Sequence, residues 1–195
     1  MGRFAPTPSG RLHLGNLLCA MLAYLSVRSR NGLFLLRIED TDIPRCPRKN
    51  TEQVLRDLER LGFEWDGEVL LQSERGEIYR EALERLEEQG LIYPCFCTRA
   101  ALHQGMAPNQ GDTRYVYPGT CRRLTPAQRD ILRLQRSPAI RVHLPEEVIG
   151  FDDRLQGRYE ENIARETGDM ILRRSDGLWA YPLCVVVDDG LSGIT

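Results

Sequence analysis

Lysine is almost absent from this chain, since Lys49 is the only one among 195 residues. Arginine therefore supplies nearly all of the positive charge, and a formal net charge of −2 gives no sign of a generally basic, nucleic-acid-binding surface. Long hydrophobic runs are lacking too. Stretches such as Leu17–Leu25 are too short to span a membrane, and no signal-peptide cleavage pattern follows one. We therefore expect a cytoplasmic protein without membrane contact.

The six cysteines come without a secretory signal, which argues against a disulfide framework. Three of them cluster in the sequence, which favours a metal site instead. The apolar fraction of 42% and the charged fraction of 28% are ordinary for a globular protein. The length fits one α/β domain with a small appendage.

A strand, a turn, a helix and a second strand are predicted at the start of the chain. Gly2–Ala5 has the pattern of a short buried strand, stopped by two prolines. The apolar stretch from Gly15 to about Arg30 predicts a helix that is buried on most sides. Leu33–Ile38 is a continuous apolar run typical of an interior parallel strand. These elements form a β-turn-α-β unit.

Later elements are predicted from periodicity and turn residues. We expect helices at Thr51–Leu61 and Ile78–Gln89, an irregular insertion from Cys95 to about Cys121, a strand at Ala139–Val142, and a hairpin of Met170–Arg173 with Leu178–Val187 that runs into a buried strand.

The segment between the first strand and the first helix has the features of a phosphate-binding turn. It reads RFAPTPSG over residues 3–10 and HLGN over residues 13–16. A helix N-terminus presents unpaired N–H groups and a partial positive charge, so it attracts phosphates. Gly15 allows a ligand close to the backbone, and either neutral tautomer of His13 can donate one hydrogen bond.

These strings resemble class I aminoacyl-tRNA synthetases. HLGN is similar to their "HIGH" signature, and both RFAPTPSG and RIEDTD (residues 37–42) resemble the glutamate-specific branch. The resemblance implies that Glu39 receives the substrate's amino group, and Arg3 could then form a bidentate pair with the substrate carboxylate. Asp40 and Asp42 could equally belong to a solvated loop.

The segment Trp179–Asp189 resembles the family's return to the nucleotide-binding fold, with Tyr181 at the border of the amino-acid pocket. The implied site falls into two groups. The catalytic group is His13, Gly15 and Asn16, and the glutamate-binding group is Arg3, Ala5, Thr7, Ser9, Glu39 and Tyr181.

The cysteine cluster combines Cys95-x-Cys97 with Cys121, and Tyr117 stands four residues before the last cysteine. Thiolates at this spacing suit tetrahedral zinc, although free reduced thiols are the alternative on spacing alone. The resemblance implies Zn²⁺ with Tyr117 as the fourth ligand. Two competitors remain, Tyr115 and His103, of which histidine is the more usual ligand. The other thiols are expected to be structural or exposed: Cys19, Cys46 and Cys184.

Within the family, three features resemble glutamyl-Q tRNA(Asp) synthetases more than glutamyl-tRNA synthetases. They are the apolar run Asn16–Leu22, the tripeptide Pro8-Ser9-Gly10 and the Cys-x-Cys insertion. The resemblance implies that ATP, with Mg²⁺, activates glutamate as glutamyl-adenylate. The glutamyl group would then pass to the queuosine base in the anticodon loop of tRNA(Asp). We expect a monomer.

The expected fold is a class I, Rossmann-like α/β nucleotide-binding fold with a zinc-containing insertion. We expect residues 1–92 to form its first half, residues 93–168 an acceptor-end-type insertion with a zinc knuckle at 95–121, and residues 169–195 an incomplete return. The family's lysine-rich "KMSKS" loop has no counterpart here, so we expect the 195-residue chain to bind ATP and glutamate weakly and to activate glutamate poorly.

Three alternatives stay open. One is the N-terminal catalytic fragment of a glutamyl-tRNA synthetase that charges tRNA(Glu). Another is a non-catalytic tRNA-binding module, and the third is a zinc-ribbon nucleic-acid-binding protein. The Pro-rich turn before the first helix speaks against the zinc ribbon, because such a small module would not need it.

Overall fold

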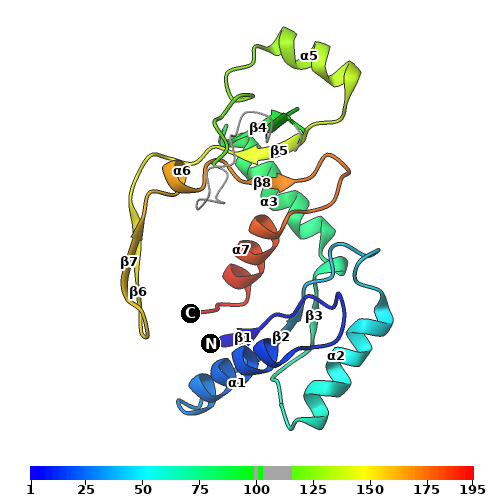
Figure 1. Ribbon diagram of the computed structural model, residues 1–195, viewed down its shortest axis with the longest axis vertical. Coiled ribbons are helices and arrows are strands. Elements are labelled where there is room, and N and C mark those ends of the chain that lie inside the picture. Colours follow the sequence, from blue (N-terminus) through cyan, green and yellow to red (C-terminus); the bar gives the residue numbers. More distant parts are fainter. Residues whose placement is uncertain (99–100, 103–115) are drawn as a thin grey trace. The chain divides into compact units, whose positions relative to one another are not determined.

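The computed structural model describes residues 1–98, 101–102 and 116–195. The chain forms two compact units, which are described separately below (Figure 1). Unit 1 comprises Met1–Arg80 with Leu183–Thr195, and unit 2 comprises Glu81–Pro182. These divisions differ from the segment boundaries expected at 92/93 and 168/169, so those functional segments remain a prediction.

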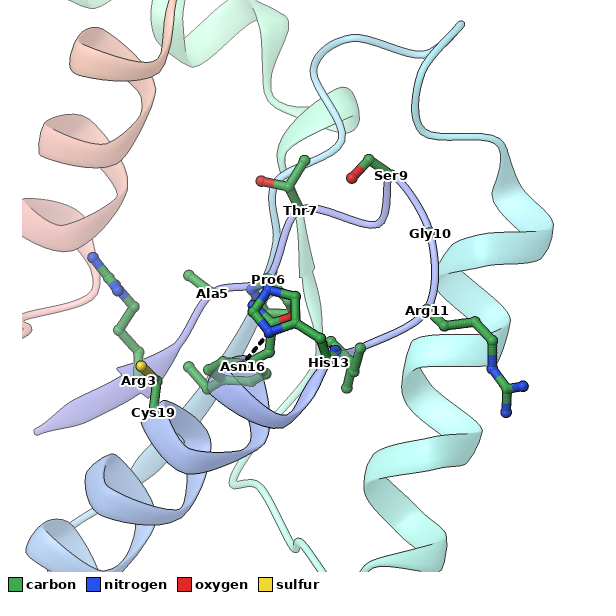
Figure 2. Close-up of a pocket in the computed structure, with 12 residues that line it drawn as sticks. Arg3, Ala5, Pro6, Thr7, Ser9, Gly10, Arg11, His13, Asn16 and Cys19 are labelled. Atoms are coloured by element: carbon green, nitrogen blue, oxygen red, sulfur yellow. Dashed lines mark hydrogen bonds between the residues drawn. The ribbon is translucent and has the colours of Figure 1, made fainter. Parts of the chain in front are cut away.

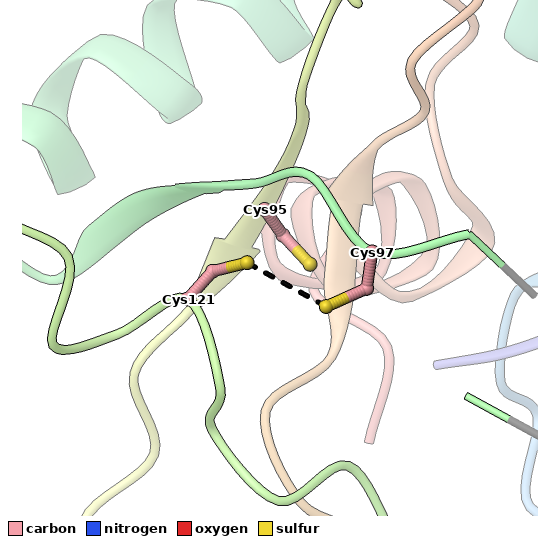
Figure 3. Close-up of side chains that lie close together, drawn as sticks. All are labelled: Cys95, Cys97 and Cys121. Atoms are coloured by element: carbon pink, nitrogen blue, oxygen red, sulfur yellow. Dashed lines mark hydrogen bonds between the residues drawn. The ribbon is translucent and has the colours of Figure 1, made fainter. Parts of the chain in front are cut away.

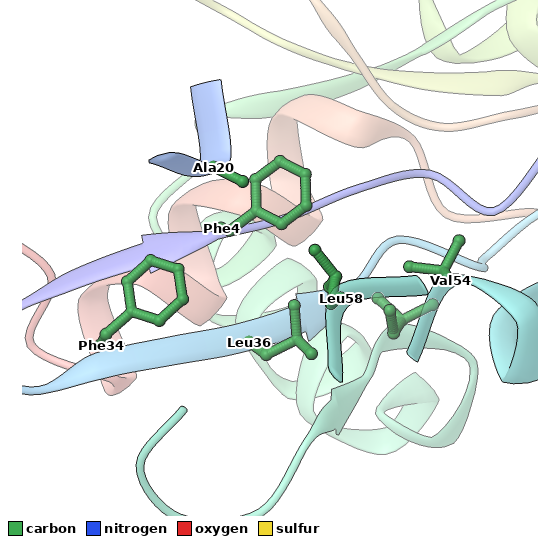
Figure 4. Packing of buried hydrophobic residues seen from close by; sticks show 7 residues of the cluster. Phe4, Ala20, Phe34, Leu36, Val54 and Leu58 are labelled. Carbon is green, nitrogen blue, oxygen red and sulfur yellow. The ribbon is translucent and has the colours of Figure 1, made fainter. Parts of the chain in front are cut away.

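Unit 1 is built on a parallel sheet in the order β1-β2-β3. The elements around it follow the predicted β-turn-α-β order: β1 (Gly2–Phe4), α1 (Leu14–Arg28), β2 (Phe34–Ile38), α2 (Arg48–Arg60), β3 (Leu70–Leu71) and the 3₁₀ helix η1 (Gln72–Glu74). Phe4 and Phe34 pack with Leu36, Val54 and Leu58 into its core (Figure 4). The predicted strand–helix–strand unit and the helix at Thr51–Leu61 are therefore confirmed.

The prediction that the first helix is buried on most sides is wrong. Only Ala20 of α1 is buried. Leu18, Met21 and Leu25 are each about half exposed, at 49%, 46% and 56%. Apolar residues run almost all the way round α1, and a helix that packs one face against a sheet must leave the opposite face uncovered. Leu61 and Phe63 line a groove beside this face, yet its apolar side chains stay about half exposed.

The prediction of a buried strand at Leu178–Val187 is also wrong. These residues mostly belong to helix α7 (Tyr181–Leu191). The hairpin survives as a single antiparallel bridge between Arg173 and Trp179. Pro182 is tolerated in the first turn of a helix, and the buried Cys184 and Asp188 stand four residues apart on one helical face. The β-branched run before Asp188 resembles a strand only locally.

A buried carboxylate fixes the part of α7 that lies in unit 1. Asp188 is fully buried and accepts hydrogen bonds from Gln72 Nε2 at 2.7 Å, Arg75 Nε at 2.7 Å and Tyr79 Oη at 2.8 Å. Because a buried carboxylate must be paired, these three donors determine which face of α7 meets η1 and the start of α3 (Gly76–Glu88). The position of the next residue, Asp189, follows from this.

Unit 2 contains the antiparallel sheet β4-β5-β8 and a separate hairpin. Its elements are β4 (Ile92–Cys95), α5 (Pro126–Gln135), β5 (Ala139–Val142), β6 (Ile149–Asp153), β7 (Gly157–Glu161), α6 (Ile163–Glu166) and β8 (Ile171–Arg173). The predicted strand at Ala139–Val142 is confirmed. No helix in the described part of the chain is long and apolar enough to cross a membrane.

Asp169 organises the interior of unit 2. Its carboxylate accepts hydrogen bonds from Tyr93 Oη at 2.5 Å, Arg122 Nη2 at 2.6 Å and the backbone N–H of Leu144 at 3.1 Å. Burial alone would raise the pKa of Asp169, but the hydrogen bonds from Tyr93 and Arg122 hold that pKa below its ordinary value. The chain around Arg122 is thereby tied to the sheet.

Candidate functional site

A pocket of about 490 Å³ opens between the end of β1 and the start of α1 (Figure 2). The sequence-predicted residues that line it are Arg3, Ala5, Thr7, Ser9, His13 and Asn16. Most of the polar side chains in the Pro-rich turn thus face one cavity. Glu39 is joined to the same turn, because its backbone N–H donates to the carbonyl of Pro6 at 3.0 Å.

His13 and Asn16 form a reciprocal cap at the start of α1. The backbone N–H of Asn16 donates to His13 Nδ1 at 3.3 Å, and the backbone N–H of His13 donates to Asn16 Oδ1 at 3.1 Å. Since Nδ1 accepts, the neutral imidazole carries its hydrogen on Nε2. Gly15 leaves room for this ring, because a Cβ there would stand 3.0 Å from His13 Cε1. The cap therefore leaves Nε2 as the donor of the imidazole.

Arg3 and Glu39 are linked by a chain of alternating charges. The guanidinium of Arg3 donates from Nε and Nη2 to the two carboxylate oxygens of Asp189, each at 2.9 Å. Arg37 donates from Nη1 to Asp189 at 2.5 Å and from Nη2 to Glu39 Oε1 at 3.2 Å. The predicted cation and anion are thus on neighbouring strands, but an aspartate of α7 occupies a bidentate edge of Arg3.

Burial and neighbouring charges together determine the pKa values of the two acids in this charge chain, Glu39 and Asp189. The side chains of Arg37 and Glu39 are 4% and 9% exposed, and that of Asp189 is 28% exposed. Burial raises the pKa of Glu39 above its ordinary value, and the adjacent Arg37 opposes that rise. For Asp189 burial acts in the same direction, but the hydrogen bonds from Arg3 and Arg37 hold its pKa below the ordinary value.

Sequence reasoning missed Arg37 and Asp189 as members of this site. One signal was present, since an arginine inside the apolar run Leu33–Ile38 has to find an anion when the strand is buried. Its partner lies 152 residues away in the sequence, so it could not be identified from spacing.

The remaining predicted residues are placed as follows. Asp40 accepts from both the backbone N–H and the hydroxyl of Ser73, each at 2.8 Å, so it fixes the loop after β2 to η1. Tyr181 is 60% exposed at the first residue of α7. It belongs to unit 2, and its role at the pocket stays a prediction.

The three clustered thiols lie together in unit 2 (Figure 3). The sulfur atoms of Cys95, Cys97 and Cys121 are within 4.8 Å of one another. Tyr117 brings its phenol oxygen to 3.4 Å from Cys95 Sγ and 3.7 Å from Cys97 Sγ. The competing candidates Tyr115 and His103 lie outside the described residues. Four potential ligand atoms therefore surround one point.

These separations suit a tetrahedral metal site. With metal–sulfur distances of about 2.3 Å, sulfur atoms at tetrahedral corners stand about 3.8 Å apart. The observed Cys97–Cys121 sulfur separation is 3.5 Å. Burial raises the pKa of Cys97 to about 11 and also raises the pKa of Tyr117. Burial acts likewise on Cys95, but its hydrogen bonds with Tyr117 and Arg141 lower its pKa below the ordinary value.

Two backbone donors point at the ligand atoms. Phe96 N–H donates to Cys121 Sγ at 3.3 Å, and Cys121 N–H donates to Tyr117 Oη at 2.9 Å. Donors of this kind stabilise anionic sulfur and oxygen. The other cysteines are not part of the cluster: Cys19 is exposed, and Cys46 and Cys184 are buried.

Comparison with known proteins assigns the family. The catalytic-domain family described as "tRNA synthetases class I (E and Q)" matches residues 1–195. The chain belongs to this family. Its resemblance to class I synthetases, read from HLGN and RIEDTD, is therefore confirmed. The mixed α/β fold seen here is the fold of a class I catalytic domain.

Within this family, the chain is similar to curated proteins that share one name. The chain is 48% identical over 195 residues to the glutamyl-Q tRNA(Asp) synthetase of Thiobacillus denitrificans. The proteins of the same name from Neisseria meningitidis serogroup B and Pseudomonas fluorescens are 46% and 47% identical. Each match covers the whole of this chain but only 62%, 64% and 60% of those relatives. The predicted similarity to glutamyl-Q tRNA(Asp) synthetases is confirmed.

Solved structures of two glutamate-specific synthetases have the same fold. A glutamate tRNA ligase from Elizabethkingia meningosepticum, in complex with its amino acid, superposes with a TM-score of 0.82 at 31% identity. The glutamate-tRNA synthetase of Elizabethkingia anophelis gives 0.83 at 31%. Both superpositions cover 99% of this chain and 42% of the other.

Proposed function

We propose that this chain supplies the glutamate- and ATP-binding site of a glutamyl-Q tRNA(Asp) synthetase. In that reaction glutamate is activated as glutamyl-adenylate and then transferred to the queuosine base in the anticodon loop of tRNA(Asp). The observation that carries the proposal is the pocket at the start of α1 together with the charge chain from Arg3 to Glu39. The names of the relatives at 46–48% identity support it.

Glutamate is the substrate that the charge chain fits. Glu39, whose carboxylate accepts a hydrogen bond from Arg37, would receive the ammonium group, and Arg3 would receive a carboxylate. A guanidinium carries five N–H donors, so Arg3 can hold Asp189 and a substrate carboxylate at the same time. Further pocket contacts are proposed for Ala5, Thr7, Ser9 and Tyr181.

ATP would lie with its phosphates at the start of α1. The Nε2–H of His13 and the N-terminal end of the helix offer hydrogen bonds and a partial positive charge. A carboxylate oxygen of glutamate forms a bond to the α-phosphorus while the bond to the β-phosphate breaks, and pyrophosphate leaves. Mg²⁺ would accompany the nucleotide. The protein contributes positioning and charge stabilisation, with Asn16 and Gly15 keeping His13 in place.

Zinc is the metal that the thiol cluster fits. Cys95, Cys97, Tyr117 and Cys121 would hold it, and the ion would keep the insertion of residues 93–168 folded where it approaches the tRNA.

A stable glutamyl-adenylate analogue tests the pocket directly. The purified 195-residue chain should be stabilised against heat by the glutamyl analogue and much less by the aspartyl and glutaminyl analogues. Glu39→Gln should abolish that stabilisation, whereas Glu59→Gln, on the exposed side of α2, should leave it unchanged. Equal responses to all three analogues would contradict glutamate recognition.

The acceptor needs a second experiment with the product of the complete reading frame. Labelled glutamate should be transferred to tRNA that contains queuosine. Periodate cleavage of the queuosine diol should abolish transfer when the terminal ribose is protected. Transfer that depends on the terminal ribose instead would identify an enzyme that charges tRNA(Glu), in line with the two glutamate-specific structures. Binding of tRNA without any transfer would indicate a non-catalytic module.

A further inference from the structure

Arg141 is a buried cation beside the cysteine cluster. It lies on β5 and is 7% exposed. Its guanidinium carbon stands 3.8 Å from the centroid of the Tyr117 ring. Nη1 donates to the backbone carbonyl of Asp169 at 2.5 Å. The guanidinium therefore lies over the ring of the phenol whose oxygen faces the thiols of Cys95 and Cys97.

No carboxylate balances this charge in the described part of the chain. None of the ion pairs among residues 1–98, 101–102 and 116–195 involves Arg141. Asp169 offers Arg141 only its backbone oxygen, because its carboxylate is engaged by Arg122 and Tyr93. Within the same residues, Nε of Arg141 is buried without a hydrogen-bond partner. A buried charge without a counter-charge is strongly unfavourable.

The metal site supplies the missing anion. One Zn²⁺ with three thiolates and one phenolate carries two more negative charges than positive ones. Burying such a negative centre alone costs free energy, as burying the arginine alone does. Placed side by side, the two charges offset part of each other's cost. The face of an aromatic ring also attracts a guanidinium, and a planar group held this close to the ring restricts the ring's tilt.

We propose that Arg141 is the counter-charge of the Cys95–Cys97–Tyr117–Cys121 metal centre and the residue that orients Tyr117 as its fourth ligand. This inference rests on the zinc site proposed above. Arg141 touches no metal, so it is a positioning residue. A lysine at position 141 would keep the positive charge but would lack the planar guanidinium that lies over the Tyr117 ring.

Metal affinity, measured apart from any enzymatic activity, tests the proposal. Zinc binding to the purified chain is measured by competition with a chromophoric chelator, and folding is checked by circular dichroism. Arg141→Met should lower zinc affinity about 10- to 100-fold, the loss typical when a residue that supports a ligand is removed. Arg141→Lys should give an intermediate loss. Arg133→Met, which removes an arginine 55% exposed on α5, should change nothing.

A double-substitution cycle separates charge balance from general loss of structure. Tyr117→Phe removes one negative ligand and weakens zinc binding by itself. In that background Arg141→Met should cost much less affinity than in the parent chain, because less negative charge remains to be balanced and no phenol remains to be oriented. Additive losses would overturn the proposal.

The outcomes are distinguishable. A parent chain that binds no zinc overturns both the metal site and this inference. A parent chain that binds zinc, with Arg141→Met binding as tightly as Arg133→Met, overturns this inference alone. If Arg141→Met does not fold, Arg141→Lys decides: unchanged zinc affinity in that variant would overturn the orienting role.

Discussion

Replacing Asp189 with asparagine should destabilise unit 1 by about 2–3 kcal/mol. Asp189 accepts two hydrogen bonds from Arg3 at 2.9 Å and one from Arg37 at 2.5 Å. A hydrogen bond to a charged group contributes about 1.5–3 kcal/mol, and breaking a fully buried ion pair costs about 3–5 kcal/mol. Because the Asp189 side chain is 28% exposed, water recovers part of that loss. The buried Arg37 keeps only Glu39 as its anion.

The assay is urea denaturation followed by tryptophan fluorescence. The chain has two tryptophans, so a Trp179→Phe background leaves Trp65, which packs against the core of unit 1, as the reporter. Glu52→Gln is the matched control. Its ion pairs with Arg48 and Arg56 are 3.6 and 3.9 Å long and more than half exposed, so it should change stability by less than about 0.5 kcal/mol.

The dependence on pH gives a second check. The folded-state pKa of Asp189 lies below its ordinary value of 3.8, so the aspartate contributes stability above that value. This contribution is lost as the pH falls through the lowered pKa. The difference between the parent chain and the asparagine variant should thus stay constant from pH 7 to about pH 4 and shrink below it. A variant no less stable than the Glu52→Gln control would refute the charge-chain reasoning.

Three substitutions or conditions probe the other parts of the site. Gly168→Ala should lower the melting temperature, since its Cβ would stand 2.8 Å from the backbone of Tyr117 at φ +74°, and it should lower zinc affinity if Tyr117 is a ligand as proposed. Gly177→Ala, at φ +87° in open space, isolates the cost of the backbone angle. Gly15→Ala should push the His13 ring aside and weaken binding of the adenylate analogue, measured by calorimetry. Because burial raises the pKa of Glu39 above 4.5, analogue binding should fall as the pH drops through that raised value, and loss only below pH 4.5 would contradict the assignment.

The first β-turn-α-β unit was predictable because its signals are local. Pro6 follows β1, Gly32 follows α1, and the run Leu33–Ile38 is apolar at every position except Arg37, as is typical of a strand inside a parallel sheet. The burial of α1 was not predictable from the same pattern. An apolar helix surface favours burial, but whether another element covers that surface depends on the tertiary structure.

Helix α7 is a second case in which the local sequence pattern did not predict the structure. Its Val185-Val186-Val187 run favours a strand locally, and the choice is made instead by the partners of Asp188, which are Gln72, Arg75 and Tyr79. Those contacts span more than 100 residues of sequence. Tertiary burial of one polar group therefore outweighs a weak local preference.

The two candidate sites differ in how much of their chemistry the sequence contains. The thiol cluster joins residues close in the chain, so Cys95, Cys97 and Cys121 could be grouped by spacing alone. The arginine beside them could not, because nothing in the strand pattern of β5 (Ala139–Val142) marks Arg141 as their neighbour. At the pocket before α1 the motif indicated Arg3 but not Asp189, which accepts its hydrogen bonds. At this pocket Asp189 comes from an element distant in sequence, whereas Glu39 finds its partner Arg37 only two residues away. A buried charge within an apolar run is the sequence signal that such a distant partner must exist.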